Sequence, residues 1–350
     1  MKYYLPTKII LGRVEQELKK EVDLFNPQKV LLITSQSIKK VGVVDKLLNC
    51  LSGYRISIFD QIKPNPSPEI IKEAKKETDL VIGLGGGSVM DVAKVIATDL
   101  KKTCITIPTT AGTGSEVTPF AALYDKENKK KLSLMVNFPD VALIDYKLTL
   151  TLPPEITAST GMDALSQAIE SYWSIYSTPL TDIHAQKAIS LVVKNLKNSW
   201  KREEKARELM ALAALEAGLA FSQTKTTAVH SVSYPLTIYY GIPHGLACGL
   251  TLPHFLVYNY QVSDANCLDK RGANFVKKRI EEITSFLGAK DVKTAKEIII
   301  NLMKEIDLPT HIDFDMKIVI KNAFSPERVA NNPRRVTIVG LKKILKEIKL

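Results

Sequence analysis

The sequence is poor in the features that would place it in several common classes of protein. It has only four cysteines among 350 residues and none in a CxxC pair, which argues against a disulfide framework or a cysteine-based zinc site. It contains no apolar run of the roughly 18 residues that a membrane helix needs, and its N-terminus lacks a secretory signal pattern. We therefore expect a cytoplasmic protein that has no membrane partner.

The chain also lacks the clusters of basic and aromatic residues that are typical of a nucleic-acid-binding surface. Its formal net charge is +11, but the lysines and arginines are scattered along helical stretches, where they alternate with acidic residues. A phosphorylated cofactor or an anionic substrate explains this positive bias as well as DNA would. We expect no nucleic-acid partner.

The first half of the chain alternates short apolar runs with helical patterns. The predicted strands are 29–34, 55–59, 80–84, 104–107 and 143–145, and the predicted helices are 41–51, 69–77 and 89–100. Such alternation is typical of a Rossmann-like α/β domain, in which helices cover both faces of a parallel sheet. Beyond Pro153 and Pro154 the periodicity is mostly helical. We therefore predict an α/β domain at residues 1–154 and an all-helical domain at residues 155–350.

Two loops that follow predicted strands have the composition of a cofactor-binding site. Residues 85–88 (GGGS) open a helix, where glycines let the backbone approach a pyrophosphate and Ser88 is expected to cap the helix. Residues 108–118 carry five hydroxyls and two glycines at the carboxyl end of a strand. A tight structural turn and a polar surface loop are the alternative interpretations. The predicted cofactor contacts in and beside these loops are Gly86, Gly87, Ser88, Asp91, Thr109, Thr110, Thr113, Ser115 and Thr118.

A further group of residues has the spacing of a metal site. Asp163 and Gln167 are four residues apart at the start of a predicted helix and so share one of its faces, as do His230 and Tyr234. His244 follows ten residues after Tyr234. Two imidazoles, a carboxylate and an amide oxygen could hold iron(II) or zinc and leave one position open for substrate. The alternative is that the histidines are structural and that Asp163 only charges a helix N-terminus.

Five motifs in order resemble the iron-containing alcohol dehydrogenase family, which includes glycerol dehydrogenases and maleylacetate reductases. They are GGGSVMDVAK (85–94), PTTAGTGSEVT (108–118), TGMDALSQAIESY (160–172), HSVSYPLTIYYGIPHG (230–245) and LPHFLVYN (252–259). The resemblance covers essentially the whole chain. It implies a dehydroquinate synthase-like architecture, with a nucleotide-binding α/β domain and a helical metal-binding and substrate domain. It also implies NADP(H) or NAD(H) and a divalent metal, iron(II) before zinc; we further expect a homodimer.

The resemblance assigns roles to residues of the second domain. By position, Asp163, His230 and His244 resemble three of the four metal ligands of the family. The fourth is normally a histidine four residues after the aspartate, but Gln167 stands there, and a neutral amide oxygen is usually a weaker ligand than imidazole. Tyr234 occupies the place of a further histidine thought to relay a proton, so we predict it as the catalytic group. Its ordinary pKa of about 10 makes it a poorer relay than histidine.

Two further stretches bear on the substrate. Residues 166–174 and 326–334 look most like the branch of the family that reduces phosphonoacetaldehyde to 2-hydroxyethylphosphonate. A phosphonate must be bound by cations, so an anionic aldehyde is a candidate substrate. The candidate cations are Lys225, Arg328, Arg334 and Arg335.

The end of the predicted strand 29–34 bears on the choice of cofactor. In the family an aspartate in this region favours NAD by binding the ribose 2′-hydroxyl, and Ser35 stands near its place here. Without that carboxylate a 2′-phosphate is not repelled, and Lys39 or Lys40 could pair with it. We therefore predict that NADPH is accepted.

The predicted function is that of a metal-dependent, NAD(P)-linked alcohol dehydrogenase or aldehyde reductase that acts on a small substrate. Two alternatives remain open. One is a lyase of the dehydroquinate synthase type, which uses NAD transiently and expects a denser set of lysines and arginines around its substrate. The other is a nucleotide-binding protein without catalysis, which Gln167 and Tyr234 keep open.

Overall fold

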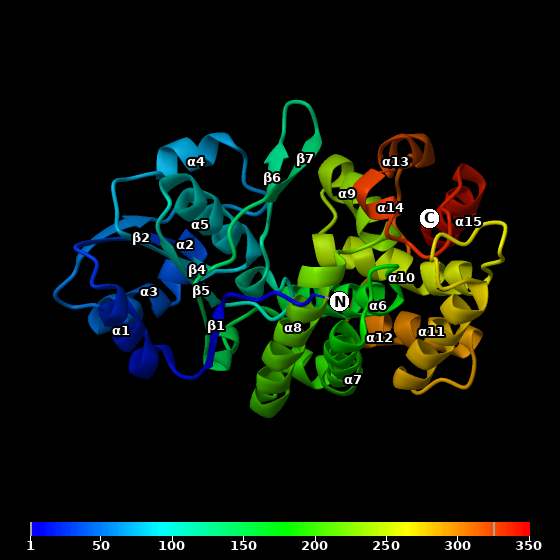
Figure 1. The fold of residues 1–350 in the computed structure, drawn as a ribbon, viewed down its shortest axis with the longest axis horizontal. Helices are drawn as coiled ribbons and strands as arrows, with labels where there is room; N and C mark the ends of the chain where they lie inside the picture. The colour runs from blue at the N-terminus through cyan, green and yellow to red at the C-terminus, as the bar shows by residue number, and fades with distance from the viewer. Residues whose placement is uncertain (1, 325) are drawn as a thin grey trace. The chain divides into compact units, whose positions relative to one another are not determined.

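The computed structural model describes residues 2–324 and 326–350, and the chain folds into two compact units (Figure 1). One unit comprises residues 4–152, and the other comprises residues 153–350 together with Lys2 and Tyr3. Within the described residues, no helix combines the length and the apolar character that crossing a bilayer requires.

A six-stranded parallel sheet forms the centre of the first unit. Its strands are β1 (Lys8–Leu11), β2 (Lys29–Ile33), β3 (Arg55–Phe59), β4 (Leu80–Gly85), β5 (Thr103–Pro108) and β8 (Val141–Ile144). They lie in the order β1-β8-β5-β4-β2-β3, and every neighbouring pair is parallel. The helices of this unit are α1 (Val14–Phe25), α2 (Gln36–Lys40), α3 (Val43–Cys50), α4 (Glu69–Ala74), α5 (Gly87–Leu100) and the short 3-10 helices η1 (Ser115–Val117) and η2 (Tyr146–Thr149).

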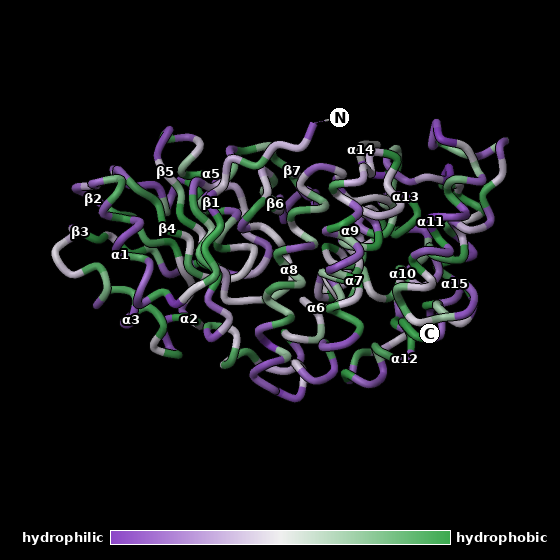
Figure 2. Tube along the Cα trace, turned by 60° about the horizontal axis from the view of Figure 1, so that its bottom comes forward, coloured by the Kyte–Doolittle hydropathy of each residue, from purple (hydrophilic) through white to green (hydrophobic). Residues whose placement is uncertain are grey.

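Helices cover both faces of this sheet. Successive residues of a strand point to opposite faces, so alternate apolar residues pack against different helices. Val30 and Leu32 of β2 pack in one apolar cluster with α1 and α3, whereas Leu31 and Ile33 pack in a second cluster with α4 and α5. The central strand β4 is buried along its whole length, and Figure 2 shows the hydrophobic colour running along the strands of the sheet. The predicted α/β fold class is therefore confirmed.

Three local features of this unit differ from the sequence prediction. The edge strand β1 was not predicted, and an antiparallel hairpin of β6 (Phe120–Asp125) and β7 (Lys130–Met135) was also missed. Lys130 and Lys131, the last two residues of the basic run 129–131, are the first two residues of β7. Helix α5 begins at Gly87, so Ser88 lies inside its first turn and does not cap it; Gly86 is the N-cap residue.

The second unit is built from helices, and its described residues contain isolated bridges but no β-strand. The helices are α6 (Pro154–Trp173), α7 (Pro179–Trp200), α8 (Glu204–Thr224), α9 (Ala228–Tyr240), α10 (His244–Tyr260), α11 (Ala273–Phe286), α12 (Val292–Glu305), α13 (Met316–Asn322), α14 (Pro326–Val329) and α15 (Ile338–Ile348). Helix α6 packs against α7, α8 and α10 and is buried almost throughout. It nevertheless carries polar side chains, and these need partners inside the unit.

Candidate metal site and cofactor loops

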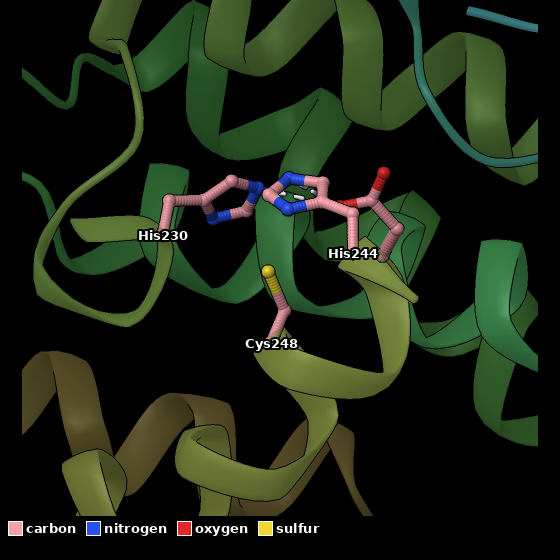
Figure 3. Close-up of side chains that lie close together, drawn as sticks. His230, His244 and Cys248 are labelled. Carbon is pink, nitrogen blue, oxygen red and sulfur yellow. Dashed lines mark ion pairs between the residues drawn. The ribbon is translucent and has the colours of Figure 1, made fainter. Parts of the chain in front are cut away.

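Three helices of the second unit bring Asp163, His230 and His244 together with Cys248. Asp163 lies on α6, His230 on α9, and His244 and Cys248 on α10. The Oδ1 atom of Asp163 is 3.3 Å from Nε2 of His230 and 4.0 Å from Nε2 of His244. One ligand atom from each of the four residues lies within 4.8 Å of all the others (Figure 3).

This arrangement depends on a close approach of α10 to α6. Gly245 has no side chain, and a Cβ placed there would stand 1.8 Å from the carbonyl oxygen of Ser159 and 3.1 Å from Cβ of Asp163. The backbone N–H of Leu246 donates to the hydroxyl of Ser159 at 3.2 Å. The contact therefore seats the first turn of α10, which carries His244, directly on the turn of α6 that carries Asp163.

Glu170 orients one of the imidazoles. It lies on α6, is fully buried, and its Oε2 bonds Nδ1 of His230. Its other oxygen accepts from the backbone N–H and the hydroxyl of Thr227, at 2.9 and 2.7 Å. Burial alone would raise the pKa of the Glu170 carboxyl, but the facing His230 ring holds that pKa below its ordinary value. With Nδ1 bound to Glu170, Nε2 of His230 faces Asp163, as in the carboxylate–histidine pairs that support metal sites.

The donor set fits a divalent metal. Asp163 is 4% exposed, and its Oδ1 is buried without a hydrogen bond of good geometry. A buried carboxylate oxygen in that condition is costly unless a cation compensates it. One carboxylate and two imidazoles are donors that suit iron(II) or zinc.

The other residues predicted for this site surround it. Gln167 is buried on α6, one turn after Asp163. The ring of Tyr234 stacks on that of His244, with centroids 5.8 Å apart and planes at 16°. The guanidinium of Arg328 lies over the Tyr234 ring, 5.2 Å from its centroid.

The four candidate cations differ in their surroundings. Arg328 donates to the hydroxyl of Thr226, beside the site. Arg334 donates to the carbonyl of Tyr258 and stacks on that ring at 4.0 Å, so it is engaged in local structure. Lys225 and Arg335 are exposed. Arg328 is therefore the one that the structure places next to the predicted metal site.

In the first unit the two predicted cofactor loops pack against each other. Gly86 and Gly87 lie beside the second loop: a Cβ on Gly87 would meet the side chain of Thr113 at 2.8 Å, and one on Gly86 would meet that of Thr110 at 3.3 Å. The hydroxyls of Thr109 and Thr110 are buried and have no hydrogen-bond partner. These two hydroxyls lie beside the N-terminus of α5, a 14-residue helix whose first N–H groups can bind an anion. Together they fit the phosphates of a dinucleotide.

Asp91, Ser115 and Thr118 form hydrogen bonds with neighbouring residues of the first unit. Asp91 accepts hydrogen bonds from the hydroxyl of Ser115 and from the backbone N–H of Ala122. The buried ammonium of Lys94 donates to the carbonyl of Thr118 at 3.2 Å. These bonds attach the hydroxyl-rich loop to α5, so they explain its position whether or not the three residues also touch a ligand.

The charged residues under this loop are unusually well buried. Burial lowers the pKa of Lys94, against the pull of Asp91. Burial likewise raises the pKa of Glu116, which lies in η1, to about 7. The charged side chains of Lys94 and Glu116 beside this loop are therefore buried within the first unit.

At the end of β2, Ser35 precedes helix α2 and its hydroxyl pairs with that of Ser37 at 2.9 Å. Lys39 forms an ion pair with Asp60 at 2.9 Å, and Lys40 is exposed. Of the two lysines suggested for a 2′-phosphate, Lys39 is therefore already paired.

Two residues that lie beside the predicted ligands, Cys248 and Glu170, were not predicted. Cys248 was set aside because it has no cysteine partner in a CxxC pair, yet it lies four residues after His244 and so shares its helix face. Glu170 was passed over because it stands in an apolar helix seven residues after Asp163, a spacing of two turns. Helical spacing from a predicted ligand was the signal available in both cases.

Comparison with known proteins identifies the family. The family described as iron-containing alcohol dehydrogenase matches residues 6–146, and the Fe-containing alcohol dehydrogenase family, C-terminal, matches residues 157–348. The chain belongs to the iron-containing alcohol dehydrogenase family. The predicted resemblance and the prediction of an oxidoreductase that uses NAD(P) and a divalent metal are thereby confirmed, and the dehydroquinate synthase-type lyase is disfavoured.

Members of this family from several organisms are similar over nearly the whole chain. An NADPH-dependent butanol dehydrogenase of Clostridium saccharobutylicum is 30% identical, over 98% of this chain and 97% of the relative. The solved structure of an iron-containing alcohol dehydrogenase of Thermotoga maritima is 30% identical with a TM-score of 0.87, covering 99% of both chains. That of a sulfoacetaldehyde reductase of Bifidobacterium kashiwanohense in complex with NAD+ is 32% identical, with a TM-score of 0.87 and 99% and 98% coverage.

Proposed function

We propose that this family member reduces small aldehydes with NAD(P)H, and oxidises the corresponding alcohols in reverse, at a metal held by Asp163, His230 and His244. The α/β domain, residues 1–154, binds the cofactor, and the helical domain, residues 155–350, binds metal and substrate. The observation that carries the proposal is the convergence of one buried carboxylate and two imidazoles around an Asp163 oxygen that lacks a good hydrogen bond.

Each residue of the metal site has a distinct task. When bound, the nicotinamide supplies the hydride and a divalent metal acts as a Lewis acid on the carbonyl. Asp163, His230 and His244 would hold that metal, and Gln167 offers an amide oxygen at the fourth position of the family. Glu170 keeps the proton of His230 on Nδ1 and so leaves Nε2 free to bind. Tyr234 stacks on His244, and we assign its hydroxyl the task of passing a proton to the product oxygen.

The two loops of the α/β domain supply the cofactor contacts. The N–H groups of Gly86, Gly87 and Ser88, at the start of α5, would hold the pyrophosphate. The hydroxyls of Thr109, Thr110 and Thr113 add hydrogen bonds, and Asp91, Ser115 and Thr118 keep the loop in place. Ser35 would meet the adenine ribose, and because it carries no negative charge it would admit a 2′-phosphate.

Cofactor oxidation with a panel of small aldehydes tests this function. We expect turnover of neutral aldehydes and of phosphonoacetaldehyde, with NADPH accepted because no carboxylate stands at Ser35 to repel its 2′-phosphate. Steady-state kinetics with NADPH and NADH give the preference, and a strong preference for NADH contradicts the cofactor part of the proposal. Tight binding of either cofactor without turnover of any aldehyde favours the non-catalytic alternative.

We further propose an anionic aldehyde, of the phosphonoacetaldehyde type, as the substrate. The support is Arg328, whose guanidinium lies over the ring of Tyr234, which in turn stacks on the predicted ligand His244. A guanidinium binds phosphonate or sulfonate oxygens through paired hydrogen bonds. One of the similar solved structures is a sulfoacetaldehyde reductase, whose named substrate is also an anionic aldehyde. The expected homodimer and cytoplasmic location stay predictions.

Replacing Arg328 with glutamine is expected to lower the preference for an anionic over a neutral aldehyde. A lost charge-assisted hydrogen bond costs about 1.5–3 kcal/mol, so the ratio of the two kcat/KM values should fall by about 10-fold to 100-fold. Arg335→Gln is the matched control, because that arginine is exposed and should leave the ratio unchanged. An equal fall for both aldehydes in Arg328→Gln would show that the residue only supports the fold.

A further inference from the structure

We propose that the thiolate of Cys248 is a ligand of the same metal and supplies the strong fourth donor that Gln167, a neutral amide, does not. This inference rests on the proposed function, because it concerns the metal placed on Asp163, His230 and His244. It makes the centre a mixed carboxylate, imidazole and thiolate site. Thiolate is a soft donor that zinc accepts readily, so this ligand set shifts the preference of the site from iron(II) toward zinc.

The geometry of the four residues carries the inference. Their candidate ligand atoms all lie within 4.8 Å of one another, and Figure 3 shows Sγ of Cys248 directed toward the rings of His230 and His244. Bonds of roughly 2.0–2.3 Å around a tetrahedral zinc ion separate its ligand atoms by roughly 3.3–3.8 Å. The Asp163–His230 pair is already at 3.3 Å. Side-chain shifts of about 1 Å therefore close the site on one ion.

The local sequence explains why the thiol reaches the site. His244 and Cys248 are four residues apart on α10, so both side chains lie on one face of the helix. Gly245 and Gly249 lie along the same helix where it meets α6: a Cβ on Gly249 would meet the side chain of Met162 at 3.2 Å. The close approach at Gly245 thus lets α10 present an imidazole and a thiol to Asp163 together.

A buried cysteine often only fills space in an apolar core, and that is the competing explanation. Cys248 is 0% exposed, as such a residue would be. Among the described residues, however, it is the only cysteine that belongs to a cluster of possible metal ligands. Its position beside a carboxylate oxygen that lacks a good hydrogen bond favours the role of ligand over that of core filler.

Cobalt(II) substitution tests the inference without using activity. The protein is stripped of metal and titrated with cobalt(II), which gives an intense near-ultraviolet charge-transfer absorption only when a thiolate is bound to it. We expect this absorption in the wild-type protein at one cobalt per chain. It should be lost in Cys248→Ser and retained in Gln167→Ala and in Cys267→Ser, which removes a thiol outside the cluster. Competition for zinc should show an affinity loss of at least about 10-fold in Cys248→Ser and a smaller loss in Gln167→Ala.

The outcomes separate this inference from the function on which it rests. If cobalt binds, and Asp163→Asn abolishes binding, but the wild-type complex has no charge-transfer absorption, the metal site stands and the role of Cys248 is refuted. The same holds if Cys248→Ser keeps the absorption. If the wild-type protein binds no cobalt at all, the metal site and the role of Cys248 are both refuted.

Discussion

Replacing Gly245 with alanine is expected to destabilise the helical unit by more than about 3 kcal/mol and to remove its metal site. The new Cβ would stand 1.8 Å from the carbonyl oxygen of Ser159 and 2.7 Å from its carbonyl carbon. These are backbone atoms inside α6, so they cannot move aside as a flexible side chain would. Either α10 retreats, carrying His244 away from Asp163, or α6 distorts. Urea unfolding and the metal content of the purified variant measure the two effects.

Gly249→Ala is the matched control for this experiment. It adds the same methyl group one turn later on the same helix, but there the Cβ meets the side chain of Met162 at 3.2–3.5 Å. These contacts require shifts of only a few tenths of an ångström, to which the end of the methionine side chain can contribute, and the higher helix propensity of alanine offsets about 1 kcal/mol of the cost. We therefore expect near wild-type stability and metal content. A Gly245→Ala protein that matches Gly249→Ala in both measurements would contradict the close approach of α6 and α10.

The parts of the fold that could be predicted from sequence are those whose pattern reflects burial on both faces. Strands β2 and β4 are mainly apolar runs because helices cover both sides of the sheet, and such runs are distinctive. Strand β1 is short, lies at the sheet edge and has both end residues exposed, so it carries no such pattern. The β6–β7 hairpin was missed because the exposed strand β7 begins with two lysines, which suggest a turn.

The metal site likewise has residues that a sequence pattern predicts and residues that only the packing of the helices brings into place. Asp163, His230 and His244 were predicted because they lie in motifs whose order matches a known family. In our proposals, Cys248 and Glu170 act through contacts between helices that are distant in sequence. Glu170, for example, bonds His230, which lies sixty residues later in the chain. Helical spacing places Glu170 on the same side of α6 as Asp163, but the contact with His230 itself depends on how α6 and α9 pack. The contact between the two cofactor loops at Gly87 and Thr113 also depends on tertiary packing and is not visible in the sequence.

Replacing Asp163 with asparagine is expected to lower kcat/KM by at least about 1000-fold, which corresponds to roughly 4 kcal/mol of transition-state stabilisation. Asparagine keeps the shape of the side chain but removes its negative charge. Asp163 is the only carboxylate in the cluster of possible ligands among the described residues, because Glu170 is engaged with Nδ1 of His230. The variant should therefore lose its metal, and added zinc or iron(II) should not restore activity. Metal analysis and steady-state kinetics measure both.

The control must separate loss of charge from loss of fold. Asp264→Asn makes the same chemical change at an exposed position of the helical unit and should leave metal content and kcat/KM unchanged. Circular dichroism and size-exclusion chromatography should show Asp163→Asn folded like the wild type, since the substitution preserves volume. Treating the wild-type protein with a chelator should then reproduce the kinetic defect, and returning the metal should reverse it only where Asp163 is intact. Full turnover by protein shown to be free of metal would refute the Lewis-acid role, and with it the reason for gathering a buried carboxylate and two imidazoles on three helices.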